Sequence, residues 1–382
     1  MHGPIVHLIW NLDVGGGELF LRDLARELQR RGVSQHICTI GPAGPLAEEL
    51  RAAGIPVTAF EKRSRLGLVT VVRLAAHLRR LVPSIVHTHG EAGVFWGLPA
   101  ARLAGTPAVS LVYQNYDETG AKMAVARRLL RWPTRVVAGS NDVARFMRDR
   151  LGVPAARLET IYCGIAPESF ARIHPAATRE HQPTIVSVGR LVTRKGHRTL
   201  IDALPEIRRR HPQAEVVIIG DGPCRGDLEA RARQIGLAHA VRLPGTVYPP
   251  HEALAGASVF VFPSLAEPQG LALLEAFAAG VPVVASRTGG ISEMLEHDVD
   301  GLLVPPGDPG ALAAAVCRLL DEPAAARGMA SHARGRLAPF HVATIADAYL
   351  RLYRDVASGR RMTRVASANP TPPAGHSEPR RS

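Results

Sequence analysis

Short apolar runs alternate with longer amphipathic segments along almost the whole chain. The apolar runs, such as residues 5–10 and 257–262, predict buried strands of a parallel sheet. The segments between them, such as residues 18–31 and 271–279, carry apolar side chains at helical spacing. Since glycine-rich loops connect many of these runs to the helical segment that follows, the pattern predicts an α/β fold built from βαβ units.

The pattern is interrupted at residues 164–183, which are rich in Ala, Pro and His and which we interpret as a linker. It therefore predicts two Rossmann-like βαβ domains that face a cleft, at residues 1–170 and 180–340, with one ligand bridged between them. A terminal helix at residues 341–356 is expected to pack back toward the N-terminal domain. Residues 357–382, with their Pro, Ser and Arg, are expected to be disordered.

The 382 residues are 46% hydrophobic, which is ample for two buried cores, and carry a net charge of +12. The charge is uneven, because residues 1–175 carry +8, residues 176–358 carry 0 and residues 359–382 carry +4. A basic first half predicts an anionic partner, for which nucleic acid, a phospholipid surface and a lipid pyrophosphate all qualify. An arginine excess from a GC-rich genome is the alternative explanation.

Residues 62–80 combine basic residues with apolar residues at helical spacing, among them Leu66, Val69 and Val72. Two interpretations stay open. A basic amphipathic helix can lie on an anionic membrane surface, which would make the protein a peripheral membrane protein. The same pattern also fits an ordinary crossover helix with a solvated basic face.

The compartment is predicted from three features. No apolar run approaches the length that spans a bilayer. The N-terminal residues lack a basic region before the first strand, so we expect no signal peptide. The cysteines lie far apart without a CxxC pair, which is typical of free thiols in a reducing cytosol. We therefore expect a cytoplasmic protein, with the inner face of the cell membrane as a further location.

The clearest chemistry lies in residues 263–275. This stretch follows an apolar run, breaks at Pro and Gly, and opens into a helical segment. Glu267 is thus expected in the loop before the helix and Glu275 on its second turn. The N–H groups of Gly270 and Leu271 would point outward at the helix N-terminus, where anions bind. Two hydroxyl-binding carboxylates beside a phosphate-binding helix end are what a sugar nucleotide requires.

Two other loops also suit phosphate groups. Arg190 and Lys195 lie before a helical segment at residues 197–210, where two cations would contact a pyrophosphate. Gly16 and Gly17 lie between the first strand and the first helix, where backbone N–H groups can approach a phosphate. This loop lacks the G-x-G-x-x-G spacing, so dinucleotide binding is only weakly indicated and a tight turn is the alternative.

His87 and His89 end a predicted strand at residues 84–90. Ligands of open α/β sheets bind at the carboxyl ends of the strands, and the turn at Gly90 makes His89 the better candidate for contact with substrate. A structural role is the alternative for both histidines. A metal pair is a third interpretation, but no pattern of carboxylate or cysteine ligands accompanies the two residues nearby.

Taken together, these motifs make the chain resemble the retaining glycosyltransferases of the GT-B fold, in the large group 1, family 4. The resemblance covers residues 5–350, and its specificity comes from spaced motifs that occur in the order of the family. The residues that carry it are Gly15 to Glu18, His87 to His89, Ser187 to Arg190, Lys195 and Gly196, Gly220 to Pro223, Glu267 to Glu275, Val281 to Ser286, Gly289, Gly290 and Glu293.

The resemblance implies a role for each site residue. Arg190 and Lys195 would neutralise the donor diphosphate and its leaving charge. Glu267 would hold hydroxyls of the donor sugar, and Glu275 would hold those of the nucleotide ribose. The backbone N–H groups of Gly270 and Leu271 would contact the sugar or a phosphate. Gly16 and Gly17 would approach the diphosphate from the N-terminal domain. His89 would stabilise an oxocarbenium-like state.

The implied function is transfer of a sugar, with retention of configuration, from a nucleotide diphosphate sugar to a glycolipid, lipid-linked or polysaccharide acceptor in cell-envelope, lipopolysaccharide or exopolysaccharide synthesis. Neither a metal nor another cofactor is expected, because cationic side chains and a helix dipole would stabilise the charge. A non-catalytic nucleotide-sugar binding protein is the first alternative. A membrane-binding or nucleic-acid-binding module is the second, although basic residues interleaved with aromatics, which single strands require, are scarce.

Three positions depart from the pattern of the family. Gln269 replaces an aromatic residue before Gly270, which leaves the donor open. Residues 163–166 replace the usual Asn-Gly-Val-Asp, and the loop at residues 113–116 lacks a frequent His. None of these departures removes Arg190, Lys195 or either carboxylate, so the enzyme prediction stands.

Overall fold

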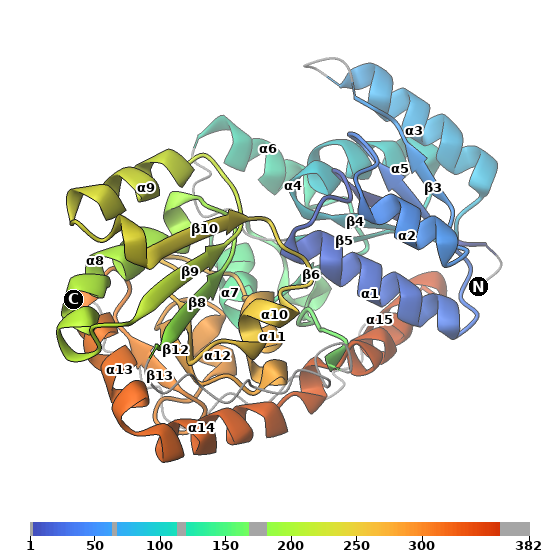
Figure 1. The fold of residues 1–382 in the computed structure, drawn as a ribbon. Coiled ribbons are helices and arrows are strands. Elements are labelled where there is room, and N and C mark those ends of the chain that lie inside the picture. The colour runs from blue at the N-terminus through green and yellow to red at the C-terminus, as the bar shows by residue number, and fades with distance from the viewer. Residues whose placement is uncertain (1–2, 63–66, 113–119, 168–181, 360–382) are drawn as a thin grey trace. The chain divides into compact units, whose positions relative to one another are not determined.

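The computed structural model describes residues 3–62, 67–112, 120–167 and 182–359, and the chain divides into two compact units (Figure 1). The N-terminal unit combines the chain up to Ala166 with the segment that begins at Phe340, and the C-terminal unit spans Pro167–Pro339. Most of the predicted linker and nearly all of the predicted disordered tail lie outside the described residues. Each unit is described separately below.

The N-terminal unit contains a parallel sheet of seven strands in the order β3-β2-β1-β4-β5-β6-β7. The strands are β1 (Ile5–Ile9), β2 (Gln35–Thr39), β3 (Val57–Ala59), β4 (Ile85–His89), β5 (Ala108–Val112), β6 (Arg135–Ala138) and β7 (Leu158–Thr160). The helices are α1 (Gly16–Arg30), α2 (Leu46–Ala52), α3 (Leu68–Leu81), α4 (Gly90–Ala92), α5 (Leu98–Ala104), α6 (Ala121–Leu129), α7 (Asn141–Asp149) and α15 (Val342–Ala357).

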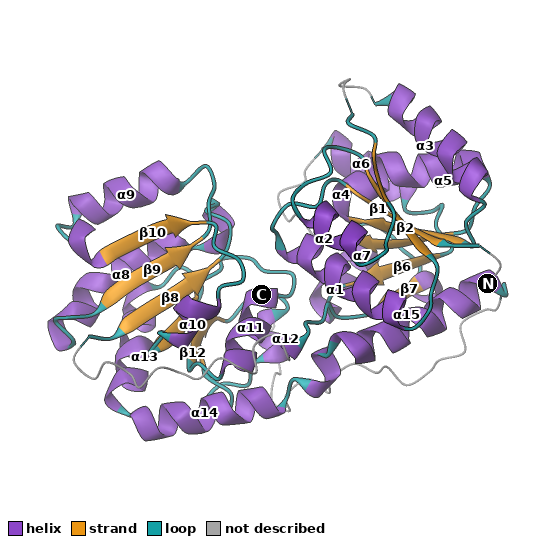
Figure 2. Cartoon of the chain, turned by 45° about the vertical axis from the view of Figure 1, so that its right-hand side comes forward, coloured by secondary structure: helices purple, strands orange, loops and turns teal. Residues whose placement is uncertain are grey.

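The C-terminal unit contains a parallel sheet of six strands in the order β10-β9-β8-β11-β12-β13 (Figure 2). The strands are β8 (Thr184–Val188), β9 (Glu215–Ile219), β10 (Val241–Gly245), β11 (Val259–Phe262), β12 (Val283–Ser286) and β13 (Leu302–Val304). The helices are α8 (His197–Arg210), α9 (Arg225–Gln234), α10 (His251–Ala255), α11 (Leu271–Ala279), α12 (Ile291–Met294), α13 (Pro309–Asp321) and α14 (Pro323–Gly335).

The predicted fold class is confirmed, because both units are parallel sheets flanked by helices. The strand β11 shows why the pattern was readable, since all four of its residues are buried and a strand covered on both faces is apolar throughout. The helix α15 packs against α1 within the N-terminal unit, where the two helices lie side by side (Figure 1). The chain thus returns to its first sheet after completing the second unit.

No element was assigned from the sequence between residues 90 and 108. Here the chain forms α4, a π-helical turn (Gly93–Gly97) and α5 in succession. Glycines weakened the helical signal, but they are needed because a Cβ at Gly93 or Gly97 would lie 2.8 or 2.9 Å from the Thr88 side chain. Close packing against β4 therefore required the residues that hid the helix.

The strand order places two pairs of loops side by side. In each sheet the order reverses next to the first strand, between β1 and β4 and between β8 and β11. Loops that follow these neighbouring strands diverge to opposite directions and leave room for a ligand at the carboxyl edge of the sheet. The loops in question carry the glycines after β1, His89 at the end of β4, the basic residues after β8 and the Pro263 stretch after β11.

The loops after β8 and β11 pack closely against each other at Gly196. A Cβ at Gly196, which has a φ of +65°, would lie 1.9 Å from the carbonyl oxygen of Pro263. The backbone N–H of Leu265 donates to the carbonyl of Arg194 at 2.8 Å. A third loop joins them, because Gly290 N donates to the carbonyl of Glu267 at 3.0 Å.

We predict that Gly290→Ala lowers the free energy of unfolding of the C-terminal unit by about 2 kcal/mol, because the added Cβ would lie 2.2 Å from the backbone oxygen of Pro268. Gly328→Ala is the matched control. It lies in α14 with nothing within 4 Å of its Cβ, so it is expected to stabilise by up to about 1 kcal/mol. Calorimetry, with far-UV circular dichroism to verify folding, measures the free energy of unfolding of both variants. Equal changes in the two variants would contradict this packing.

Three histidines lie in the core of the N-terminal unit, on the face of the sheet that α15 covers. His7, His87 and His89 are at most 1% exposed, and His7 is paired with His87 in the register of β1 and β4. Burial lowers the pKa of His7 from 6.5 to about 4, and it lowers the pKa values of His87 and His89 in the same direction. All three imidazoles are therefore neutral at pH 7.

The sign of the resulting pH dependence follows from linkage. Unfolded His7 binds a proton near pH 6.5 and folded His7 only near pH 4, so the N-terminal unit loses stability as the pH falls through this window. We predict that His7 alone contributes a loss of about 2 kcal/mol between pH 7 and pH 5, and that the loss is smaller in His7→Gln. Trp10, Trp96 and Trp132 all lie in this unit, so tryptophan fluorescence in urea at pH 7 and pH 5 measures it. A pH-independent midpoint would refute the prediction.

Candidate active site

A part-buried ion pair joins the loops that follow β8 and β11 in the C-terminal unit. Lys195 Nζ lies 2.5 Å from Glu267 Oε2, and the two side chains are 15% and 7% exposed. The hydroxyl of Ser264 donates to the same carboxylate oxygen at 3.2 Å. The structure thus brings together a predicted cation and a predicted carboxylate that are 72 positions apart in the chain.

Local backbone geometry positions both charges. Lys195 ends a single 3-10 turn (Thr193–Lys195), and the left-handed Gly196 then starts α8. Its Nζ lies 5.1 Å from the ring centroid of Phe262, the last residue of β11, which adds a cation–π contact. Phe262 also packs against Gly270, where a Cβ would lie 2.6 Å from the ring. One aromatic ring therefore supports the lysine and fixes the start of α11.

The helix α11 begins where the sequence predicted. Gly270 is its N-cap with a φ of +99°, and the first helical residue is Leu271. The first N–H groups of any helix have no partner within the helix, so these two residues can donate to an anion. Glu275 lies on the second turn and is 8% exposed, and Gln269 before the cap is 5% exposed. The carboxylate and the helix end thus belong to one rigid element.

Arg190 differs from Lys195 in its surroundings. It lies two residues after the end of β8 and is exposed, so its guanidinium is available to solvent or to a ligand. The backbone of this loop packs closely against Gly220. A Cβ at Gly220 would lie 2.0 Å from the carbonyl oxygen of Gly189. The loop after β8 therefore presents one exposed cation, Arg190, and one part-buried cation, Lys195.

His197 and Ser264 were not predicted as site residues from the sequence. His197 is the first residue of α8 and is 2% exposed, with Nδ1 3.3 Å from the Ser187 hydroxyl. Burial, and then the charge of Lys195, lower the pKa of His197 to about 4, so a neutral ring lies beside the lysine. Both residues stand directly next to predicted motifs, but only the tertiary contacts distinguish them from other polar neighbours.

The N-terminal unit brings its own predicted residues to one switch point. Gly16 and Gly17 are the first two residues of α1, after the N-cap Gly15, and Gly16 is exposed. His89 is the last residue of β4, the neighbour of β1 in the sheet. Its imidazole is buried rather than open to solvent. A role of these residues in binding a ligand stays a prediction.

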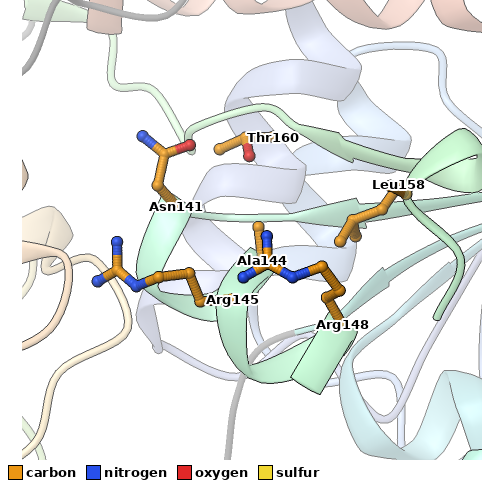
Figure 3. A pocket seen from close by; sticks show the side chains of 7 residues that line it. Asn141, Ala144, Arg145, Arg148, Leu158 and Thr160 are labelled. Atoms are coloured by element: carbon orange, nitrogen blue, oxygen red, sulfur yellow. The ribbon is translucent and has the colours of Figure 1, made fainter. Parts of the chain in front are cut away.

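A pocket lies elsewhere on the N-terminal unit, between α7 and β7 (Figure 3). Asn141, Arg145 and Arg148 point toward it from α7, and it includes none of the predicted site residues. Both arginines pair with carboxylates of their own helix, Arg145 with Asp142 at 3.1 Å and Arg148 with Asp149 at 2.8 Å. We assign no ligand to this pocket.

Comparison with known proteins places each unit in a family. Residues 14–169 match the model of "Glycosyltransferase Family 4", and residues 182–322 match that of "Glycosyl transferases group 1". Among solved structures, Anabaena HepE in complex with UDP and glucose has a TM-score of 0.82 at 23% identity, over 92% of this chain and 100% of that one. This likeness shows the shared GT-B fold.

Two mycobacterial relatives are closer in sequence. The GDP-mannose-dependent α-(1-6)-phosphatidylinositol monomannoside mannosyltransferase of Mycobacterium tuberculosis is 37% identical over 58% of this chain, and the match spans 63% of that relative's length. The glycogen synthase of the same organism is 32% identical over 73% of this chain and 70% of its own. The chain belongs to the group 1, family 4 glycosyltransferases of the GT-B fold.

Proposed function

We propose that this protein transfers a sugar from a nucleotide diphosphate sugar to a lipid-linked or glycan acceptor, with retention of configuration. The observation that carries the proposal is the buried pair of Lys195 and Glu267 beside the N-terminus of α11. A cation, a carboxylate and helix N–H groups within two adjoining loops match the diphosphate and the hydroxyls of such a donor.

The pair divides two tasks between its members. Before the donor binds, Lys195 and Glu267 satisfy each other, which avoids an isolated buried charge. A bound diphosphate would offer Lys195 a second anion, while Glu267 keeps the Ser264 hydroxyl and accepts hydrogen bonds from sugar hydroxyls. In the transition state, negative charge grows on the leaving diphosphate, which the lysine is already positioned to stabilise.

The remaining residues complete the proposed donor site. Arg190 is an exposed cation on the same loop as Lys195 and would contact the outer side of the diphosphate. Glu275 would accept hydrogen bonds from the ribose hydroxyls. With these cations and the N-terminus of α11 holding the charge, we propose that the reaction needs no metal.

The donor and acceptor are inferred only as classes. The named relatives include a GDP-mannose-dependent enzyme and the solved neighbours include a UDP complex, so both nucleotides belong in a test. A phosphatidylinositol monomannoside mannosyltransferase acts on a lipid and a glycogen synthase is named for a glycan, so the acceptor class spans both. Gln269 inside the donor motif is the residue most suited to alter the choice of sugar.

We predict that Lys195→Ala and Glu267→Gln each lower the transfer rate by at least about a hundredfold, because each removes a charge at the reacting diphosphate or sugar. A panel of UDP-, GDP- and ADP-sugars, screened by thermal stabilisation of the protein, first identifies the donor. Transfer is then measured with that donor and with lipid or glycan acceptors.

The matched control is Arg198→Ala, which removes an exposed cation from the first turn of α8. It is expected to transfer at the rate of the wild type. Circular dichroism verifies that all variants are folded. Unchanged turnover in Lys195→Ala or Glu267→Gln would refute the assignment, and stabilisation by a nucleotide sugar without transfer to any acceptor would favour a non-catalytic binding protein.

The solvent face of α3 supports the membrane interpretation of the basic helix. Leu68, Val69 and Val72 are 70%, 66% and 61% exposed, although they are apolar. The buried face of the helix is formed by other residues, such as Val71 and Leu74. The exposed basic residues of the helix are Arg73, Arg79 and Arg80. An ordinary crossover helix would not expose three adjacent large apolar side chains beside arginines.

We therefore propose that α3 lies on an anionic membrane surface, where a lipid-linked acceptor is found. None of the described helices is both long and apolar enough to span a bilayer.

We predict that the protein co-sediments with vesicles containing anionic lipid and that the triple variant Leu68→Ser, Val69→Ser, Val72→Ser binds at least about tenfold more weakly. Val125→Ser removes a 46% exposed valine from α6 and is the control, with binding expected to be unchanged. Binding should weaken as the salt concentration is raised, because salt screens the attraction between the arginines and the anionic lipid. Equal binding of the triple variant and the wild type would contradict the assignment of α3.

A further inference from the structure

A cluster of histidine and cysteine side chains lies between β2 and α3 of the N-terminal unit. His36 and Cys38 belong to β2, and His77 belongs to α3. One candidate ligand atom of each residue lies within 4.8 Å of those of the other two. Cysteine sulfur and imidazole nitrogen are the ligands that zinc and other thiophilic metals prefer in proteins. The cluster contains none of the residues assigned to the donor.

The strand and the helix explain why these side chains meet. Successive side chains of a strand point to opposite faces, so His36 and Cys38 project from the same face of β2. Cys38 is fully buried and shares an apolar core with Leu74 and Leu78, which lie on the covered face of α3. His77 lies one helical turn after Leu74 and so borders that face. The cluster is therefore part of the contact between α3 and the sheet.

The hydrogen bonding of His77 is incomplete in this contact. Its Nε2 atom is buried and has no hydrogen-bond partner among the described residues. The ring packs edge-on against His36 and Phe60, with centroids 5.2 and 5.5 Å apart. A buried polar nitrogen without a partner is unfavourable. A metal ion that accepts its lone pair would remove this cost.

The other two side chains are held by the sheet. His36 Nε2 lies 2.9 Å from the Thr58 hydroxyl of β3, and a contact of this kind orients a histidine ligand. Thr58 is paired with Cys38 in the register of β2 and β3, so the thiol lies on the same side of the sheet. Cys38 is a free cysteine. Its sulfur is therefore available to a metal.

We propose that His36, Cys38 and His77 bind a thiophilic divalent metal ion such as zinc, and that this ion ties α3 to β2. On binding, the Cys38 thiol releases its proton to solvent and coordinates as the thiolate, while each histidine contributes a lone pair. Ligand atoms around a tetrahedral zinc ion lie about 3.5 Å apart, so side-chain movements of about 1 Å close the site. Three protein ligands leave the fourth position to water.

A second group of candidate ligands, His7, His87 and His89, lies deeper in the same unit. Its rings are engaged with other groups, since His7 Nδ1 lies 3.0 Å from His89 Nε2 and His87 Nδ1 lies 2.7 Å from the Tyr353 hydroxyl. The three rings are at most 1% exposed, and the group offers no sulfur. We therefore assign the ion to the cluster with Cys38 and include the second group in the test.

Metal binding is measured on the full chain without a polyhistidine tag, loaded with zinc and then dialysed. We expect about one zinc ion per chain by mass spectrometry. Cobalt(II) in place of zinc should give the charge-transfer absorption of a thiolate ligand. Cys38→Ser should abolish this absorption, and His77→Gln should weaken zinc binding at least about a hundredfold, because each removes a direct ligand.

The matched controls remove the same chemical groups elsewhere. Cys224→Ser alters a free cysteine of the C-terminal unit, and His239→Gln alters an exposed histidine. Both should keep the zinc affinity and the cobalt spectrum of the wild type. Circular dichroism verifies that every variant is folded.

Thermal unfolding gives a second readout. An ion that binds the folded state stabilises it, so zinc should raise the melting temperature of the wild type by at least about 3 °C. The shift should persist in Cys224→Ser and His239→Gln. It should disappear in Cys38→Ser and in His77→Gln, which separates loss of the ion from any change in the stability of the metal-free protein.

The outcomes do not involve sugar transfer, so the metal site and the proposed function can fail independently. Absence of bound zinc, or a cobalt spectrum without thiolate absorption, would overturn the site. Wild-type zinc affinity in Cys38→Ser or His77→Gln would overturn the choice of ligands. Zinc that is lost in His7→Asn and retained in Cys38→Ser would place the ion in the second group and would also overturn the proposal.

Discussion

The ion pair of Lys195 and Glu267 depends on two loops approaching more closely than most sequences allow. Removing two charges from water costs several kilocalories per mole each, and only a good geometry with further hydrogen bonds offsets this cost. Gly196 permits that geometry because its backbone touches Pro263, and Ser264 adds a hydrogen bond to the carboxylate. The ion pair therefore needs both loops in their observed places.

The parallel sheets explain why such loops meet at all. In both units the strand order reverses beside the first strand, and the loops that follow the two neighbouring strands emerge at the same edge. In the C-terminal unit this edge collects the charges, and in the N-terminal unit it collects glycines and a buried histidine. The same topology therefore gathers charged side chains at this edge in one unit and neutral groups in the other.

Neutrality in the N-terminal unit has a physical origin. Three imidazoles are buried side by side, and burial keeps all of them unprotonated at pH 7. Neutral rings can direct hydrogen bonds through their tautomers, which a protonated ring cannot do because both of its nitrogens donate. The arginines of α3 lie on the surface of this unit, away from the buried histidines.

The sequence by itself determined the local elements and the chemical inventory. Buried parallel strands are apolar throughout, so β11 and α11 were predicted almost to the residue, and Glu267, Glu275, Arg190 and Lys195 were identified beside them. The elements between residues 90 and 104 were missed, because glycines needed for packing on Thr88 weaken the helical signal.

Only the tertiary structure decided which residues meet. Lys195 and Glu267 are 72 positions apart, and His7 and His89 are 82 apart. The sequence around each residue does not show which distant residue it contacts. Strand order and register bring these residues together. The tertiary structure also decided which side chains are buried. His89 is a neutral residue in the core, whereas Leu68 and Val69 are exposed to solvent.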